Sequence, residues 1–132
     1  MSQENVELVK RSIEMFNRGD LDALFLDADP EIEWHDQPEL PGATVHRGAE
    51  AAAEHLRSAM RDLSGYRVNP EEFVDVGANV VVCGQVSAQG RASDIPVQRP
   101  HFAAYAIRAG RICRVRIFGT RAEALEAAGL SE

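Results

Sequence analysis

Apolar positions recur every three or four residues near the start of the chain and alternate with polar ones through most of its second half. The first pattern predicts an amphipathic helix that Gly19 ends. Its apolar stripe consists of Val6, Val9, Ile13 and Phe16. Asp20 is placed to cap a second short helix over 21–26, which Asp29-Pro30 terminates.

The middle of the chain mixes both patterns. A short strand is expected over 31–35, followed by a loop over 36–47 that carries two prolines and a glycine. Helical spacing returns over 48–63 and is expected to end at Ser64-Gly65.

Alternation dominates the remainder and predicts strands over 66–76, 80–88, 97–108 and 111–118, with a polar loop over 90–96. Pro100 inside the third of these strands indicates a bulge or an unpaired position. Thr120 is placed to cap a closing helix over 121–128. Helices first and long strands afterwards favour an α+β fold. No repeat or linker divides the chain, so we expect one domain over 1–132.

The composition of the chain limits the kinds of partner that it is expected to bind. The 132 residues carry a net charge of −7, from 21 acidic and 14 basic residues, which disfavours binding to nucleic acid. The arginines at 108, 111, 114 and 116 fall in a strand pattern and are expected to form a solvated face or a subunit contact. No signal peptide or membrane-length apolar run occurs, so a cytoplasmic protein without membrane contact is expected.

Several stretches together resemble the SnoaL-like branch of the nuclear transport factor two superfamily. They are ENVELVKRSIEMFNRGDLDAL, DPEIEWHDQPELPG, VHRGAEAAAEHL, EEFVDVGANVVVCGQV and AIRAGRICRVRIFGTRAEALEAAGL. The resemblance implies a cone, in which a curved antiparallel sheet carries about three N-terminal helices on its concave face and ends in a short C-terminal helix. It also implies frequent pairing of two cones through the outer sheet face. The superfamily includes ketosteroid isomerases, limonene epoxide hydrolases and polyketide cyclases, so the fold alone does not fix an activity.

Asp36 is the first candidate for chemistry. It follows the strand of Trp34, and in ketosteroid isomerases an aspartate in a similar strand-end context moves a substrate proton. A carboxylate at an apolar cavity wall can have a raised pKa, which suits a general base. The alternative is a loop aspartate that caps the turn toward Pro38. Alternation places His35 on the opposite face from Asp36, as a surface side chain.

His101 and Tyr105 share one face of the long strand over 97–108. In SnoaL-like relatives the aromatic positions of this strand often line the cavity, so both side chains are expected to face inward. Tyr105 would donate a hydrogen bond to a developing oxyanion and His101 would orient a partner. The alternative is a half-buried pair satisfied by backbone or water.

Other inward stripes complete an expected pocket for a small apolar molecule. Its further lining residues are Phe16, Trp34, His55, Leu56, Met60 and Ile117. No group of histidines, cysteines or acids shows a metal-binding spacing and no phosphate loop occurs, so neither a metal nor another cofactor is expected. The last strand, Arg114-Val115-Arg116-Ile117-Phe118, lacks the acid that limonene epoxide hydrolases carry there.

Three functions therefore stay open. The first is a cofactor-free isomerase, cyclase or hydratase that works by proton transfer. The second is a module that binds an apolar small molecule without chemistry. The third is a dimerising domain whose cavity is a by-product of packing. We also expect a homodimer through an outer face that carries Arg114, Arg116 and Phe118.

Overall fold

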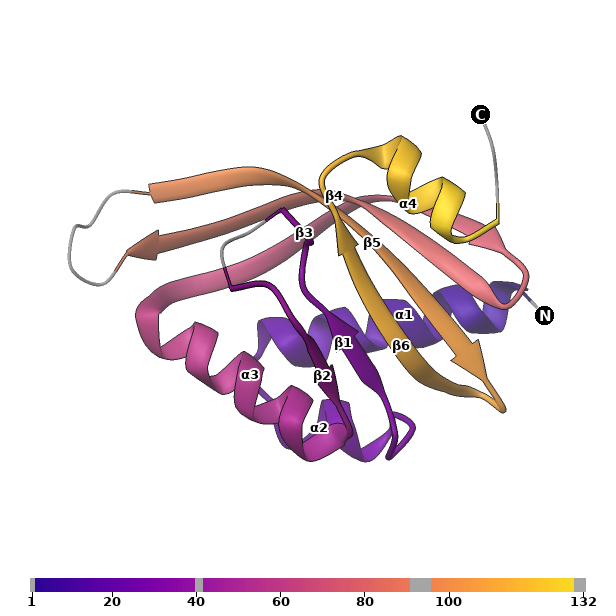
Figure 1. Ribbon diagram of the computed structural model, residues 1–132, viewed down its shortest axis with the longest axis horizontal. Coiled ribbons are helices and arrows are strands. Elements are labelled where there is room, and N and C mark those ends of the chain that lie inside the picture. The colour runs from indigo at the N-terminus through magenta and orange to yellow at the C-terminus, as the bar shows by residue number, and fades with distance from the viewer. Residues whose placement is uncertain (1, 40–41, 91–95, 130–132) are drawn as a thin grey trace.

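A computed structural model describes residues 2–39, 42–90 and 96–129 (Figure 1). The elements follow the order α1 (Ser2–Asn17), α2 (Leu21–Leu26), β1 (Glu33–His35), β2 (Val45–Arg47), α3 (Ala49–Asp62), β3 (Leu63–Val76), β4 (Asn79–Gly90), β5 (Pro96–Arg108), β6 (Arg111–Phe118) and α4 (Arg121–Ala127). Within these residues, no helix has both the length and the apolar character that crossing a membrane requires.

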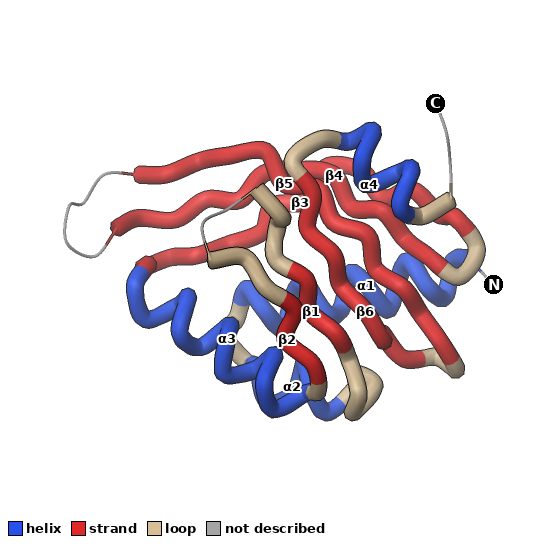
Figure 2. The backbone as a smooth tube through the Cα atoms, in the orientation of Figure 1, coloured by secondary structure: helices blue, strands red, loops and turns tan. Residues whose placement is uncertain are grey.

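The strands form one curved sheet in the order β2-β1-β6-β5-β4-β3, as Figure 2 shows. All neighbours are antiparallel except β1 and β6, which are parallel. The α+β class, the curved sheet, the N-terminal helices and the short C-terminal helix are confirmed, and the pair of β1 with β6 is the one departure from antiparallel pairing among these strands. The parallel pair arises because β1 enters the sheet beside β6, far from its sequence neighbours, after the two N-terminal helices.

Helices α1, α2 and α3 lie on one face of the sheet and α4 lies on the other (Figure 2). The larger core joins the stripe of α1 to inward residues of β4 and β5, including Val80, Val82 and Ala103. The smaller core joins the outward residues Val81 and Ala104 to α4. Alternation along the strands thus supplies two cores from the same sequence, one on each face.

Short polar side chains fix the helix ends. The Asp20 carboxylate accepts a hydrogen bond from the Ala23 amide at 3.1 Å and caps α2. Thr120 caps α4 in the same way, through the Glu123 amide at 3.2 Å. At the end of α1, the Asn17 side chain accepts from the Val68 amide and donates to the Val68 carbonyl, each at 2.9 Å, which ties the helix to β3.

The structure corrects three expected boundaries. The expected loop over 36–47 contains β2, whose three residues are too few to show alternation. The strand after α3 begins at Leu63, and the predicted helix end at Ser64-Gly65 is wrong. Gly65, with a φ of +65°, instead lies within β3, in a register shift between Ser64 and Arg67. The strand expected over 31–35 begins only at Glu33.

Pro100 lies opposite Gln85 without a register shift between β4 and β5. On the other edge of β5, Pro100 lies beyond the end of β6, because β6 pairs with β5 only from Phe102 onward. The missing amide proton of a proline is tolerated at such a position. Most of the loop expected over 90–96 lies outside the described residues.

Arg114, Arg116 and Phe118, which were expected on the outer face, lie on the side of the sheet that carries α4. The Arg116 guanidinium donates to the Ala127 carbonyl at 3.2 Å, and Phe118 packs against the smaller core. The Nε atoms of Arg114 and Arg116 are buried without a hydrogen-bond partner among the described residues. Pairing of two copies through this face stays a prediction.

Gly84 allows β3 to bulge across β4, and replacing it tests that packing. A Cβ at this position would meet the Asn69 carbonyl oxygen and lie 2.9 Å from the Pro70 Cα, both of them backbone atoms with little room to move. Gly84→Ala is therefore expected to lower the free energy of unfolding by about 1–3 kcal/mol in urea titrations. Gly119→Ala is the matched control, because its Cβ would meet mobile side-chain ends of Gln37 and Glu39. Equal stability of the two variants would contradict the prediction.

Candidate functional site

A cavity of about 390 Å³ lies between the three N-terminal helices and the concave face of the sheet. Its size falls in the range of small-molecule sites, and most of its wall is apolar. All nine residues named from the sequence line it: Phe16, Trp34, Asp36, His55, Leu56, Met60, His101, Tyr105 and Ile117. The structure therefore brings the expected set together, and the role of each residue in binding stays a prediction.

Alternation along β1 decides which of its neighbours reach the cavity. Trp34 and Asp36 line it, whereas His35 lies on the other side and its Nε2 is 2.9 Å from a Glu33 carboxylate oxygen. That hydrogen bond lowers the pKa of Glu33 from its usual value. His35 is thus directed away from the cavity, as alternation predicts, and its side chain is half-buried rather than fully exposed.

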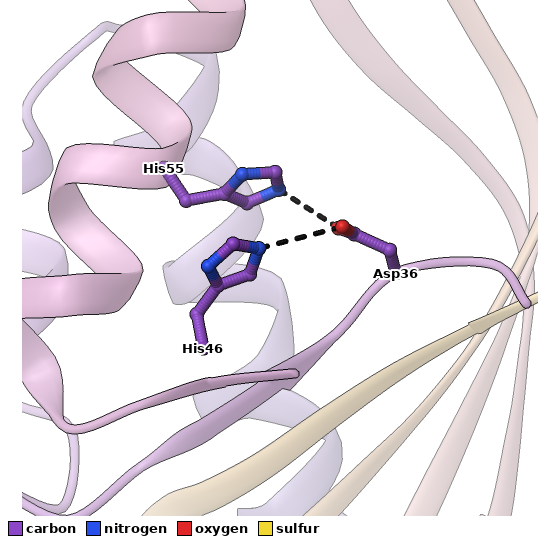
Figure 3. A group of neighbouring side chains, drawn as sticks. All are labelled: Asp36, His46 and His55. Atoms are coloured by element: carbon purple, nitrogen blue, oxygen red, sulfur yellow. Dashed lines mark hydrogen bonds and ion pairs between the residues drawn. The ribbon is translucent and has the colours of Figure 1, made fainter. Parts of the chain in front are cut away.

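Asp36 lies at the centre of a cluster with two histidines (Figure 3). Its Oδ1 is 2.8 Å from Nε2 of His55 on α3, and its Oδ2 is 3.4 Å from Nε2 of His46 on β2. The two imidazole rings stack with centroids 3.8 Å apart and planes 16° apart. Three elements that are separate in the sequence therefore position one carboxylate.

The backbone also orients Asp36. Its amide donates to the Thr44 carbonyl at 3.1 Å, and the Thr44 amide donates back to Oδ2 at 3.3 Å. These bonds extend the short β1–β2 ladder, in which Trp34 lies opposite His46. The carboxylate is consequently fixed by backbone and by side chains, which is the kind of orientation that a reacting group requires.

His101 and Tyr105 lie on β5, two pleats apart, and both line the cavity. Among the described residues, neither side chain has a hydrogen-bond partner. Burial lowers the pKa of His101 to about 4, so its ring is neutral near pH 7. Burial raises the pKa of Tyr105, so its hydroxyl keeps its proton. The sheet side of the cavity therefore offers two uncharged polar groups in an apolar wall.

Sequence reasoning missed two polar residues of the site. His46 completes the Asp36 cluster, but it belongs to β2, which was expected to be loop. Tyr66 lines the cavity and packs edge-on against Phe16 at 5.5 Å between ring centroids. Its position depends on β3 starting before Gly65, and burial raises its pKa.

One group of side chains could hold a cation. The ligand atoms of Asp36, His46 and His55 all lie within 4.8 Å of one another. The spacing in the sequence gave no indication of this group, because its members come from separate elements and meet only through the fold.

Taken together, the cavity places a fixed carboxylate and two neutral hydrogen-bonding groups around one apolar space. A carboxylate can accept a proton from carbon. A neutral tyrosine can donate a hydrogen bond to an oxygen that gains charge. The arrangement can therefore support proton transfer on an uncharged molecule.

Comparison with known proteins gives one matching family model and several similar solved structures. Residues 9–115 match the model of the SnoaL-like domain. No curated protein sequence matches the chain. An NTF2-like protein from Burkholderia xenovorans LB400 is similar in structure, with a TM-score of 0.77, 27% identity and coverage of 98% of both chains.

Two more distant structures share the fold. A candidate SnoaL-like polyketide cyclase from Jannaschia sp. CCS1 has a TM-score of 0.78 and 19% identity over 89% of this chain and 85% of its own. A hypothetical protein with a ketosteroid isomerase-like fold from Catenulispora acidiphila DSM 44928, in complex with trimethylamine, has a TM-score of 0.77 and 14% identity over 94% and 93%.

The buried His101 ring predicts a loss of stability in acid. Because its pKa is about 4 in the folded chain and near 6.5 when unfolded, the unfolded chain takes up the proton first as the pH falls. Relative to His101→Gln, the wild type should lose about 2–3 kcal/mol of unfolding free energy between pH 6.5 and 4. Urea titrations of both proteins across this range measure the difference, and parallel pH profiles would contradict it.

Trp34 borders the cavity and is only partly buried, so its ring is not packed on all sides. Trp34→Ala is expected to lower the free energy of unfolding by less than about 3 kcal/mol, below the 3–5 kcal/mol typical of a fully packed ring. Chemical denaturation followed by circular dichroism measures this value. A loss above about 4 kcal/mol would mean that the ring is packed as a core residue.

Proposed function

The chain belongs to the SnoaL-like domain family, and on that premise we propose that it binds a neutral, largely apolar carbonyl compound and moves a proton on it without a cofactor. Such a reaction is an isomerisation, a cyclisation or a hydration. Asp36 is the proton carrier, and Tyr105 stabilises the oxygen that gains charge. His101 lines the same wall and holds the substrate or the tyrosine in place.

The observation that carries this proposal is a pair of polar side chains, His101 and Tyr105, that line the cavity without a hydrogen-bond partner among the described residues. Tyr105 is 5% exposed, faces the cavity and has no hydrogen bond among the described residues. A ligand oxygen would satisfy it. Since His101 and Tyr105 are both neutral near pH 7, they favour a carbonyl or hydroxyl oxygen over a charged group.

The chemical step uses two groups that line the cavity, Asp36 after β1 and Tyr105 on β5. The C–H bond next to the carbonyl breaks, and its proton passes to a carboxylate oxygen of Asp36. The electron pair moves onto the carbonyl oxygen, which accepts a hydrogen bond from Tyr105. The proton then returns to the same or another carbon, so no oxidant or reductant is consumed.

Binding without chemistry is the second candidate, and one observation favours it. Both carboxylate oxygens of Asp36 already have hydrogen-bond partners, Oδ1 with His55 and Oδ2 with His46 and Thr44. A base must release such a partner or use a free lone pair before it can take a proton. A ligand that binds to the wild type without any proton exchange would favour this candidate.

Proton exchange in a neutral bicyclic ketone such as β-tetralone tests the proposal. Trp34, the single tryptophan, lines the cavity and reports binding by its fluorescence. In D₂O the wild type should speed deuterium uptake at the carbon next to the carbonyl, followed by NMR. Asp36→Asn should lower this rate by at least about 100-fold, because the base is lost. Tyr105→Phe should lower it by about 100- to 1,000-fold, because one donor is lost.

Fluorescence titrations with the ketone separate a role of Asp36 or Tyr105 in proton transfer from a role in binding. The ketone should still quench the Trp34 fluorescence of both variants, and its affinity for each should be close to its affinity for the wild type. Asp22→Asn is the matched control, because the Asp22 side chain is 95% exposed and does not line this cavity. Full exchange activity in Asp36→Asn would rule out Asp36 as the base.

A further inference from the structure

The cluster of Asp36, His46 and His55 combines the ligand types of a transition-metal site. We propose that these three side chains bind one divalent transition-metal cation, such as Zn²⁺, at the wall of the cavity (Figure 3). The site joins the end of β1 to β2 and α3, so it forms only in the folded chain.

The donor set suits such an ion. Two imidazole nitrogens and one carboxylate oxygen are a ligand set that zinc takes in sites that keep a further position open. Hard cations such as Mg²⁺ and Ca²⁺ prefer sites made of oxygens alone. Bond lengths of about 2.0–2.2 Å place tetrahedral ligands about 3.3 Å apart. The two N···O distances here, 2.8 and 3.4 Å, are close to that separation.

Ion entry requires only local movement. Both Nε2 atoms are directed at the carboxylate, so the ion would replace the two hydrogen bonds as the rings rotate apart. The Thr44 amide, which donates to Oδ2 of Asp36, holds the carboxylate from behind. Groups of this kind orient ligands in known metal sites.

Access and charge also favour a cation. The side chains of Asp36, His46 and His55 are 17, 21 and 28% exposed, so the cluster is shielded yet open to small ions. No lysine or arginine pairs with Asp36 among the described residues, and the chain carries a net charge of −7. Asp36 and His55 both line the cavity, so an open coordination position would face the ligand space.

The site and the proposed reaction use the same carboxylate. An ion bound to Asp36 holds one of its carboxylate oxygens, and the positive charge of the ion makes the carboxylate a weaker proton acceptor, so metal binding opposes proton transfer by the same group. This consequence rests on the proposed function, whereas binding of the ion does not. Saturating Zn²⁺ should therefore stop deuterium exchange in the wild type.

Titration of metal-free full-length protein with Zn²⁺ tests the site. Isothermal titration calorimetry should give one ion per chain, and Co²⁺ should give the intense visible absorption of a four-coordinate site. Asp36→Asn, His46→Ala and His55→Ala should each weaken Zn²⁺ binding at least tenfold. Mg²⁺ should give no binding heat.

His35→Ala is the matched control, because His35 lies next to the cluster in the sequence but pairs with Glu33 on the other side of β1. It should bind Zn²⁺ like the wild type. If circular dichroism shows that an alanine variant does not fold, His46→Asn and His55→Gln replace it. Failure of the wild type to bind Zn²⁺, or equal binding by folded cluster variants, would overturn the site. Zn²⁺ binding that leaves exchange unchanged would instead overturn Asp36 as the base and leave the site standing.

Discussion

The three residues of β1 set the register on which the cavity depends. Trp34 lies opposite Val115 of β6 on one side and opposite His46 of β2 on the other. Because side chains alternate between the faces of a strand, a slip of one residue would turn Trp34 and Asp36 outward and bring His35 inward. Burial of Trp34 against Phe25, at 6.5 Å between ring centroids, favours the observed register. The position of the carboxylate is therefore decided by the packing of its apolar neighbour.

The two sides of the cavity differ in electrostatic character. The side formed by the β1–β2 hairpin and α3 holds an acid with two imidazoles, all of them partly exposed. The side formed by β5 holds His101 and Tyr105 as neutral groups, because burial shifts the pKa of each away from its charged form. An uncharged substrate in the cavity would have both a proton acceptor and a hydrogen-bond donor on its wall. Keeping water from the donor strengthens its interaction with a developing charge.

Local patterns in the sequence predicted most of the fold, and contacts between distant segments account for what they missed. Alternation on β5 placed Tyr105 inward and Ala104 outward, and the structure confirms this division between its two cores. The parallel pairing of β1 with β6 and the existence of β2 depend on tertiary packing. Strands of three residues are too short to show a pattern in the sequence that would predict either feature. Asp36 was recognised as a candidate from its context after Trp34. His55 was predicted to line the pocket, but neither its pairing with Asp36 nor that of His46 could be predicted, because only the fold brings both imidazoles to the same carboxylate.

Packing argues that the cavity is more than a by-product of the cone. On the convex face, α4 covers the sheet so closely that Val81, Ala104 and Ala124 are fully buried. On the concave face the same strands leave about 390 Å³ unfilled, although protein interiors otherwise pack densely. Larger side chains in place of Ala59 or Ala43 on the cavity wall would fill part of this space and add apolar contacts. A cavity of this size, beside polar side chains that have no hydrogen-bond partner among the described residues, has the form of a binding site, which disfavours a purely structural role.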